Sequence, residues 1–182
     1  STGNPRPKVY GVKREGINEG SNSIIAIDLN KKKIIWQFKE TFHDLWNLDV
    51  AFPPILADID IKNKSYKVLI SSTKIGNILM LERFTGRPIF DIDFIKTPKS
   101  KINNEIVSPF QPKINKPVPV TKFEWTPKDI DKLNNEFSKK ILNNLIDYEF
   151  GLFTPPAPNK AFVYMAEGPI WEGGAFNSKN NQ

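Results

Sequence analysis

Short runs of apolar residues alternate with polar turns along the first half of the chain. Two of these runs, residues 23–29 and 34–38, are rich in Ile and aromatic side chains and flank the polar turn 30–33. Such a pair predicts a β-hairpin, which we place at residues 22–40. A second hairpin is expected at residues 66–92, where further apolar runs are separated by short polar turns. The chain is therefore expected to be built largely of β-strands.

The two predicted hairpins share one spacing of residues. Each carries a small or apolar residue, an acidic residue two positions later, and an aromatic residue ten positions after the first. The first set is Ala26, Asp28 and Trp36, and the second set is Met80, Glu82 and Phe90. A hairpin pattern that recurs at about 40–50 residues or slightly more is typical of stacked propeller blades, although two copies also arise by chance in an ordinary β protein. Both aromatic residues are expected to pack within their hairpins rather than against a ligand.

The middle of the chain has a different composition. Residues 96–150 begin with a stretch rich in Pro and Lys and predict a long irregular excursion. A loop of this length inside a compact domain is usually functional or covers another surface. One helix is expected inside it, with Thr126 as N-cap and Pro127 at the first helical position, and apolar residues keep helical spacing to Tyr148. A final strand region is expected at residues 151–176.

Size and composition indicate a folded domain. The chain has 182 residues, of which 39% are hydrophobic and 25% charged, enough for one domain with a core. Lys and Arg exceed Asp and Glu by 26 to 20, which gives a net charge of +6. The lysines are mixed with Asn and Ile, a bias that coding composition explains as readily as an anionic partner does. They form no stripe with interleaved aromatic residues, so no nucleic-acid partner is expected; a nucleic-acid binder would lose affinity steeply with salt.

The chain contains no cysteine, which excludes a disulfide framework and a thiolate metal site. No apolar run approaches the ~18–20 residues needed to span a bilayer, and the first residues do not resemble a signal peptide. Both ends of the sequence are polar and turn-like, and we expect them to be cuts through a longer protein.

The densest cluster of reactive side chains lies in residues 43–49. These seven residues contain an imidazole, an indole, two carboxylates and an amide, and His43 is the only histidine in the chain. The cluster directly follows an apolar run, so we expect it to leave a strand at the rim of a sheet, where functional side chains commonly lie. An ordinary polar turn is the alternative interpretation.

Together these features resemble the quinoprotein dehydrogenases that use pyrroloquinoline quinone (PQQ), and most closely their membrane-bound glucose, quinate and shikimate branch. The resemblance runs over nearly the whole chain and consists of short motifs in the family's order. The matching segments are Gly3-Asn4-Pro5, residues 26–36, His43-Asp44-Leu45-Trp46, residues 53–58, Thr73-Lys74-Ile75-Gly76-Asn77, residues 81–86, residues 108–112 and residues 153–156. Each motif alone is weak, and the shared order carries the resemblance.

The resemblance implies an all-β fold that is a fragment of an eight-bladed β-propeller, with about two blades and a long excursion with one helix. The rest of the propeller would be a partner, and PQQ would bind near its axis with Ca²⁺ or Mg²⁺. The implied activity is oxidation of an alcohol group of a sugar or polyol, with a membrane quinone as electron acceptor. The parent enzyme is expected in the periplasm, attached to the inner membrane, and the fragment alone is expected to be inactive.

The resemblance also assigns site residues. Lys74 matches the family's cation that contacts the quinone, and Asn4 matches its side-chain amide ligand to the metal; a solvated turn lysine and a turn asparagine are the alternatives. The family's catalytic Asp stands at the position of Asn47, and an amide cannot accept the substrate's proton. Asp49 shares a face with Asn47 if the segment is extended, and is a possible substitute. We expect Lys74 and the loop around Asn47 to converge beside the cofactor.

Several departures leave alternative interpretations open. Residues 165–174, after a strand expected at 161–165, lack the family's Pro-Gly-Asn element and reverse its Trp-Glu order. His43 and Asp44 match the family, but a structural pair that orients the loop is the simpler interpretation. Because Asn47 replaces the expected base, the alternative function is a non-catalytic propeller segment, either a binding or structural module or a degraded gene fragment.

Overall fold

The computed structural model describes residues 1–121, 126–130, 135–144, 148–158, 161–162, 168 and 172–180. The described residues form four small sheets and two helices. The strands are β1 (Ser23–Asp28), β2 (Lys33–Lys39), β3 (Ile55–Ile61), β4 (Lys64–Ser72), β5 (Ile78–Glu82), β6 (Asp93–Lys96), β7 (Phe110–Lys113), β8 (Tyr148–Glu149) and β9 (Ala161–Phe162), and the helices are α1 (Pro127–Ile130) and α2 (Asn135–Asn144). Most of this regular structure is antiparallel strand, so the prediction of an all-β fold is confirmed.

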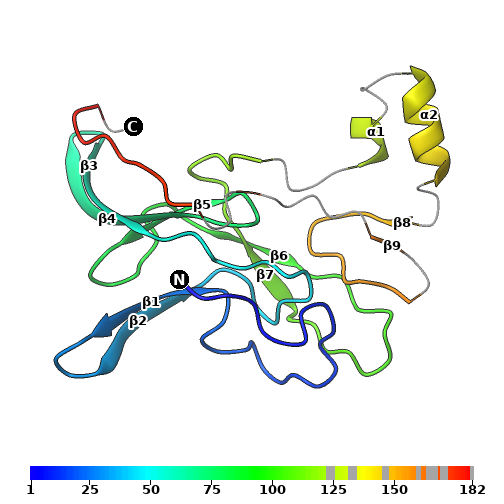
Figure 1. Cartoon of the computed structure of the whole chain (residues 1–182), viewed down its shortest axis with the longest axis horizontal. Helices are drawn as coiled ribbons and strands as arrows, with labels where there is room; N and C mark the ends of the chain where they lie inside the picture. The colour runs from blue at the N-terminus through cyan, green and yellow to red at the C-terminus, as the bar shows by residue number, and fades with distance from the viewer. Residues whose placement is uncertain are drawn as a thin grey trace.

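Strands β1 and β2 form the first predicted hairpin, which projects from the body of the molecule (Figure 1). Its acidic residue holds the turn that follows β1, because Asp28 Oδ1 accepts hydrogen bonds from the backbone N–H groups of Asn30 (3.0 Å) and Lys31 (2.9 Å). Glu82 does the same after β5, where its Oε2 accepts from the N–H of Thr85 at 2.8 Å. The repeated acidic position therefore marks two turns that are held by a carboxylate.

Strands β3, β4 and β5 form an antiparallel sheet in that order. The β3–β4 turn places Lys62 and Asn63 at φ of 50° and 62°, the backbone that a two-residue hairpin turn requires. The second predicted hairpin corresponds to β4 and β5. The returning run at residues 88–92 joins the sheet through an isolated bridge between Leu81 and Pro88.

A third hairpin, β6–β7, lies where the composition predicted the start of an irregular excursion. Strand β7 contains Pro112, which is paired opposite Phe94 of β6. Proline lacks the N–H that a central strand needs, but a two-stranded hairpin leaves one edge of each strand unpaired and tolerates it. The prediction of irregular structure from residue 96 onward is therefore wrong for this part of the excursion.

Helices α1 and α2 lie in the region where one helix was expected, and residues 131–134 between them lie outside the described residues. Thr126 lies directly before α1, where its hydroxyl donates to Asp129 Oδ2 at 2.8 Å and its N–H donates to the same oxygen at 3.0 Å. Helix α2 ends at Asn144, and Tyr148 opens strand β8, which pairs in parallel with β9. The predicted continuation of the helix to Tyr148 is thus wrong. Of the strand predicted at 161–165, residues 163–165 lie outside the described residues.

Two clusters of buried apolar side chains connect these elements. The first joins β1, β4, β5 and the segment after β7, and consists of Ile24, Val50, Leu69, Leu79, Leu81 and Ile114. The second lies under the segment that follows β2, and consists of Leu45, Trp46, Leu48, Ile75 and Phe153. Strands β1–β4 lie on one side of the molecule, and the helices lie on the other side together with the short β8–β9 pair (Figure 1). The second cluster packs the loop that carries the candidate site residues against the turn after β4.

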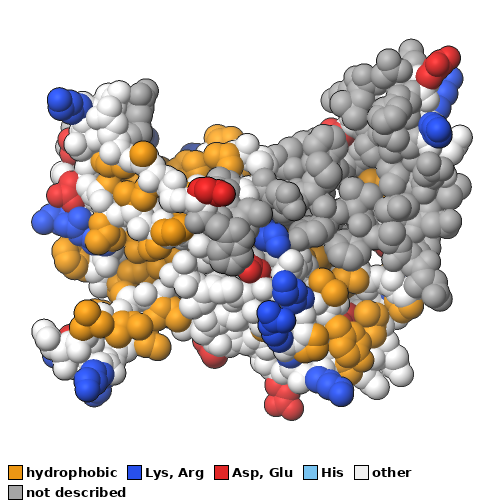
Figure 2. Space-filling view, viewed as in Figure 1, with side chains coloured by type: hydrophobic (Ala, Val, Ile, Leu, Met, Phe, Trp, Pro, Cys, Tyr) orange, Lys and Arg blue, Asp and Glu red, His pale blue; other side chains and the backbone are white. Residues whose placement is uncertain are grey.

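Apolar side chains also remain on the surface over the strands (Figure 2). The exposed large hydrophobic residues of the first hairpin and its turn are Ile27, Leu29, Ile34 and Ile35, and Leu29 is 83% exposed. Contiguous apolar surface of this kind commonly marks a face that another protein segment covers.

Trp36 and Gly86 show how the first hairpin packs against the β5 turn. The indole Nε1 donates to the Arg83 carbonyl oxygen at 3.2 Å. Gly86 has a φ of 70°, and a Cβ added there would lie 2.4 Å from Trp36 Cε3. These contacts support the prediction that Trp36 is a packing residue rather than a ligand contact.

We expect Gly86→Ala to lower the free energy of unfolding by about 2–4 kcal/mol, because it combines a left-handed backbone with overpacking against the indole. The measurement is the midpoint of urea unfolding by tryptophan fluorescence in the complete gene product that carries these residues. Gly20→Ala is the matched control, since Gly20 has a φ of 76° with nothing within 4 Å of its added Cβ. Equal losses in the two variants would show that the contact with Trp36 contributes nothing.

Candidate functional site

Asp44 organises the loop that follows β2. The residue is 0% exposed. Its Oδ1 accepts from the N–H of Trp46 at 2.7 Å, and its Oδ2 accepts from the N–H of Leu48 at 2.8 Å and from Asn22 Nδ2 at 3.0 Å. Burial raises the pKa of Asp44, and these hydrogen bonds oppose that rise. The carboxylate is therefore a structural acceptor that sets the path of residues 44–48.

His43 is also buried, at a φ of 46°. Its Nδ1 lies 2.7 Å from the carbonyl oxygen of Gly16, while Nε2 is buried without a hydrogen-bond partner. A Cβ added to Gly11 would lie 2.6 Å from Nε2, so this nitrogen faces the backbone of the N-terminal loop. Among the hydrogen bonds of the described residues, none joins His43 to Asp44. The interpretation of both as structural fits these contacts, but they do not act as a pair.

Asn47 and Asp49 are the half-buried residues of this loop. Asn47 has a φ of 62°, a backbone that asparagine adopts more readily than most residues. Its neighbour Trp46 is fixed by an indole N–H that donates to the Thr154 carbonyl oxygen at 2.8 Å and by an edge contact with Phe153. The Oδ1 atoms of Asn47 and Asp49 are both buried, and neither has a hydrogen-bond partner in the described part of the chain. The loop thus holds two unpartnered oxygen acceptors in a fixed place.

Lys74 lies in a tight turn after β4. The N–H of Thr73 donates to the Asn77 carbonyl oxygen at 3.0 Å, and the N–H of Gly76 donates to the Thr73 carbonyl oxygen at 2.8 Å. Gly76 has a φ of 87°, and a Cβ there would lie 2.0 Å from Thr121 Oγ1. The turn therefore needs glycine at this position, both for its backbone and for the close approach of Thr121.

Backbone hydrogen bonds bring the turn and the loop together. The N–H of Lys74 donates to the Asp49 carbonyl oxygen at 3.4 Å, and the Lys74 carbonyl oxygen accepts from the N–H of Gly168 at 3.0 Å. On the other side of the loop, the N–H of Val50 donates to the Thr2 carbonyl oxygen at 3.3 Å. We call the place where segments 2–4, 47–50 and 73–77 meet the junction.

The N-terminal segment of the junction carries Asn4. A Cβ added to Gly3 would lie 3.6 Å from Asp49 Oδ2, so the backbone before Asn4 passes the Asp49 carboxylate. The Asn4 amide Nδ2 donates to the Pro5 carbonyl oxygen at 3.3 Å, which leaves its side-chain oxygen as the atom that could bind a cation. The described residues contain no group of three or more His, Cys, Asp or Glu that could hold a metal ion.

Glu40 is a residue of the junction that sequence reasoning missed. It follows β2, is 1% exposed, and its Oε1 accepts from Thr73 Oγ1 at 2.7 Å and from Asn77 Nδ2 at 2.8 Å. Burial raises the pKa of Glu40 to about 7, against these two hydrogen bonds, and the charge of Asp44 raises it further. No local pattern marks this glutamate as buried, because its partners lie on a distant turn.

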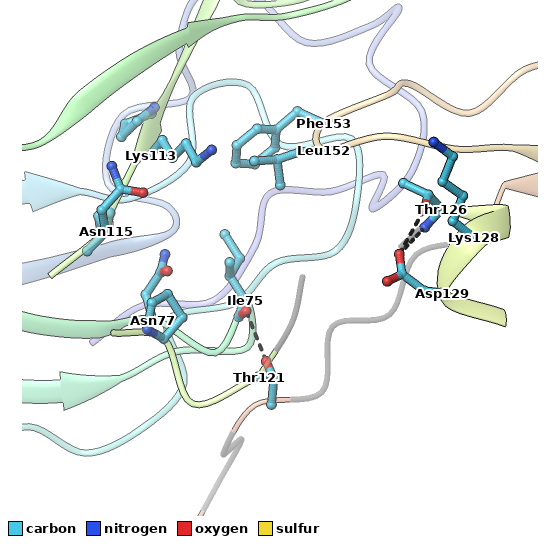
Figure 3. A pocket seen from close by; sticks show the side chains of 13 residues that line it. Ile75, Asn77, Lys113, Asn115, Thr121, Thr126, Lys128, Asp129, Leu152 and Phe153 are labelled. Carbon is cyan, nitrogen blue, oxygen red and sulfur yellow. Dashed lines mark hydrogen bonds between the residues drawn. The ribbon is translucent and has the colours of Figure 1, made fainter. Parts of the chain in front are cut away.

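A cavity of about 590 Å³ lies beside the turn, within the usual range for small-molecule sites. Figure 3 shows Asn77, Lys113 and Asn115 on one side of it and the α1 residues Lys128 and Asp129 on the other. The Thr121 hydroxyl donates to the Ile75 carbonyl oxygen at 3.4 Å within its lining (Figure 3). The cavity thus combines amide groups and ammonium groups, which are donors suited to an anionic or oxygen-rich ligand.

The predicted site residues lie on neighbouring segments of backbone. Asn4, Asn47, Asp49 and Lys74 belong to the three segments of the junction, and a backbone hydrogen bond joins the Lys74 turn to the loop that carries Asn47. Of the departure at residues 165–174, only Gly168 and residues 172–174 lie within the described residues. A Cβ at Gly168 would lie 2.3 Å from the Thr73 carbonyl oxygen, so the backbone of Gly168 lies against the Lys74 turn.

Comparisons with known proteins identify relatives along the whole chain. The sequence model of the family described as "PQQ: Glucose/ethanol/alcohol dehydrogenase, beta-propeller domain" matches residues 1–182. Quinoprotein glucose dehydrogenase A of Acinetobacter calcoaceticus is 30% identical over 97% of this chain and 23% of its own length. Quinoprotein glucose dehydrogenase of Escherichia coli (strain K12) is 26% identical over 97% of this chain and 22% of its own length.

Among solved structures, quinohemoprotein alcohol dehydrogenase from Comamonas testosteroni aligns with a TM-score of 0.45 and 27% identity, over 67% of this chain and 18% of that protein. The chain spans less than a quarter of the length of the two glucose dehydrogenases that it matches.

Proposed function

The chain belongs to the family of PQQ-dependent glucose, ethanol and alcohol dehydrogenase β-propeller domains, and on that premise we propose that it forms part of a dehydrogenase that oxidises an alcohol group of a sugar or polyol and passes the electrons to a quinone-type acceptor. The family and the antiparallel sheets confirm the predicted fold class, a segment of a β-propeller. Membership also means an oxidoreductase family that uses PQQ.

The names of the relatives support the proposed substrate class. They include glucose dehydrogenases, a glycerol dehydrogenase large subunit of Gluconobacter thailandicus, and a probable quinate dehydrogenase (quinone) of Xanthomonas campestris pv. juglandis. These names describe sugars, polyols and one cyclic polyhydroxy acid, and one of them specifies a quinone. The chain covers only part of each relative, so substrate and acceptor are proposals for the complete protein.

One observation carries the proposal: the junction holds buried oxygens that nothing in the described residues satisfies. A buried polar atom without a partner costs about 1–3 kcal/mol, so such atoms usually face a ligand, an ion or water. Asn47 Oδ1 and Asp49 Oδ1 are two of these atoms. The residues that the resemblance assigns to the cofactor and metal lie on the adjoining segments, so the junction fits a bound polar group.

We assign the residues of this chain as follows. Lys74 would hold the oxygens of PQQ and stabilise negative charge that develops on them. The side-chain oxygen of Asn4 would be one ligand of Ca²⁺ or Mg²⁺, since both ions prefer oxygen. The cofactor, when bound, supplies the site that accepts a hydride, while the protein supplies binding and orientation.

The proposed reaction needs a group that accepts the proton of the substrate hydroxyl. Asn47 can hydrogen-bond the substrate hydroxyl but cannot take its proton. Asp49 is the carboxylate of the junction, with Oδ1 buried and unpartnered, and we propose it as the substitute base. The hydrogen bond from the Lys74 N–H to the Asp49 carbonyl oxygen supports this assignment, because it joins the backbones of the two residues.

The proposed location is the periplasm, with the complete protein attached to the inner membrane and the remaining propeller packed against the exposed apolar faces of the strands. The quinone in the names of the quinate dehydrogenases supports a membrane acceptor. Neither helix in the described part of the chain has the length and apolar character needed to cross a membrane.

Direct binding of the cofactor tests the proposal. The complete gene product should bind PQQ in the presence of Ca²⁺ or Mg²⁺, and Lys74→Ala should weaken that binding about 10–100-fold, the value of one or two hydrogen bonds to a charged group. The measurement is a titration of tryptophan fluorescence with PQQ. Lys67→Ala, on the exposed side of β4, is the matched control and should bind as the unchanged protein does. If PQQ does not bind with either ion, the proposed function is wrong.

The second candidate function is a non-catalytic propeller segment, and Asn47 at the position of the family's base favours it. In that case the complete gene product would bind PQQ but oxidise no sugar or polyol, and changing Asn47 to Asp would leave it inactive.

A further inference from the structure

Glu40 ties the two ends of the Lys74 turn to one atom. Its Oε1 accepts hydrogen bonds from the side chains of Thr73, at the start of the turn, and Asn77, at its end. Thr73 is 0% exposed and Asn77 is 6% exposed, so water does not compete for these bonds. Lys74 lies between the two anchored residues.

Stability alone does not explain a carboxyl group at this place. A buried carboxyl is costly unless a cation or several hydrogen bonds compensate for it. Among the described residues the Oε2 atom of Glu40 has no hydrogen-bond partner, and the carboxylate of Asp44 repels a negative charge on Glu40. The nearby cations are used elsewhere: Arg14 donates to the Asp44 carbonyl oxygen at 2.6 Å, and Lys39 donates to the Asn18 carbonyl oxygen at 2.9 Å.

The remaining contacts of Lys74 do not hold it firmly by themselves. Its N–H donates to Asp49 at 3.4 Å, which is long for a hydrogen bond between amide and carbonyl. Its carbonyl oxygen accepts from Gly168 at 3.0 Å. The direction in which the Lys74 side chain leaves the backbone therefore depends on the shape of the turn, and the Glu40 carboxyl group fixes that shape from both ends.

We propose that Glu40 is a positioning residue: by accepting hydrogen bonds from Thr73 and Asn77, it holds Lys74 in the direction that reaches the cofactor. This inference rests on the proposed function, because it assumes that Lys74 contacts PQQ. Glu40 itself touches neither cofactor nor substrate in this proposal. The turn requires an acceptor oxygen. Glutamine at position 40 should therefore keep Lys74 in position, whereas an apolar side chain of similar size should not.

The test compares PQQ binding by variants of the complete gene product, titrated with PQQ in the presence of Ca²⁺ and followed by tryptophan fluorescence. Glu40→Leu leaves the Thr73 hydroxyl and the Asn77 amide without their acceptor, and we expect the dissociation constant to rise about 10–100-fold, since a small misplacement of a binding group has effects of that size. Glu40→Gln should bind close to the unchanged protein. Thr41→Val is the matched control, because the Thr41 hydroxyl is buried next to Glu40 without a partner and its removal breaks no hydrogen bond.

A double variant separates positioning from general disruption. If Glu40 acts through Lys74, then Glu40→Leu should have little further effect once Lys74→Ala has removed the side chain that it positions. Circular dichroism of each variant checks that the protein is folded, and Glu40→Gln provides the folded comparison if Glu40→Leu is not. Unchanged binding in Glu40→Leu, loss of binding in Glu40→Gln, or a full effect of Glu40→Leu in the Lys74→Ala background overturns this inference and leaves the proposed function intact. Absence of PQQ binding by the unchanged protein overturns both.

Discussion

Replacing Asn47 by Asp should raise the turnover of the PQQ-loaded complete gene product on sugars or polyols by up to about 10²–10⁴-fold, the usual contribution of a general base, and by less if Asp49 already serves as that base. The two side chains have nearly the same shape, and aspartate tolerates the φ of 62° found at this position. The flanking residues Trp46 and Leu48 are buried and hydrogen-bonded, so the backbone should stay in place. The new carboxylate would stand where the unpartnered Asn47 oxygen now lies.

The same experiment, combined with a change at Asp49, decides whether Asp49 is the substitute base or the segment is non-catalytic. If Asp49 is the substitute base, Asp49→Asn should remove the residual turnover of the unchanged protein while leaving its binding of PQQ in place. In the Asn47→Asp background, Asp49→Asn should then have a small effect, because the base is again at position 47. If Asn47→Asp produces no turnover on any sugar or polyol although PQQ is bound, the chain is part of a non-catalytic module.

Replacing Asp44 by Ala should open the loop that carries Asn47. The change leaves the N–H groups of Trp46 and Leu48 without their acceptor in a buried place. It also removes one of the two acceptors of the Asn22 amide, which keeps its hydrogen bond to the Leu48 carbonyl oxygen at 2.6 Å. Each unsatisfied buried donor costs about 1–3 kcal/mol, so we expect local stability to fall by about 3–5 kcal/mol. Hydrogen exchange measured by mass spectrometry on peptides that cover residues 40–50 should show the loss directly.

The comparison for this prediction is an aspartate of the surface. Asp58→Ala removes a partly exposed ion pair with Arg83 at 2.9 Å, and exposed pairs contribute about 0–1 kcal/mol. Exchange in residues 40–50 should therefore be unchanged in Asp58→Ala. Asp44→Asn should behave like Asp44→Ala, because its amide presents a donor where Oδ2 now accepts. Slow exchange in both Asp44 variants would mean that apolar packing of Leu45, Trp46 and Leu48 is sufficient to hold the loop.

The features that sequence patterns predicted correctly depend on neighbours along the chain. The first hairpin and strands β4 and β5 follow from apolar runs and polar turns, and the acidic residues at positions 28 and 82 bind N–H groups two and three residues later. The N-cap at Thr126 is a local contact of the same kind. Interactions between residues this close along the chain can be predicted from the order of the residues.

The errors have a different origin. The β6–β7 hairpin joins Phe94 to Pro112, and neither strand has the composition that predicts one, because the pairing rather than the propensity decides it. The helix expected to reach about Tyr148 does not include that residue, which is in strand β8 and pairs with Ala161. In each case a partner many residues away determines the backbone conformation. A pattern of neighbouring residues does not identify such a partner.

The sequence by itself determined the β1–β2 and β4–β5 hairpins, the order of motifs that marks the family, and the replacement of the expected base by Asn47. Only the tertiary structure decided that Glu40 is buried under the Lys74 turn, that Asp44 holds its loop without His43, and that three distant segments meet in one junction. The hydrogen bonds that join Glu40 to Thr73 and Asn77 span 33 and 37 residues. The packing of the sheets decides which acceptor lies opposite a given donor at such a separation. No periodicity of the chain encodes that pairing.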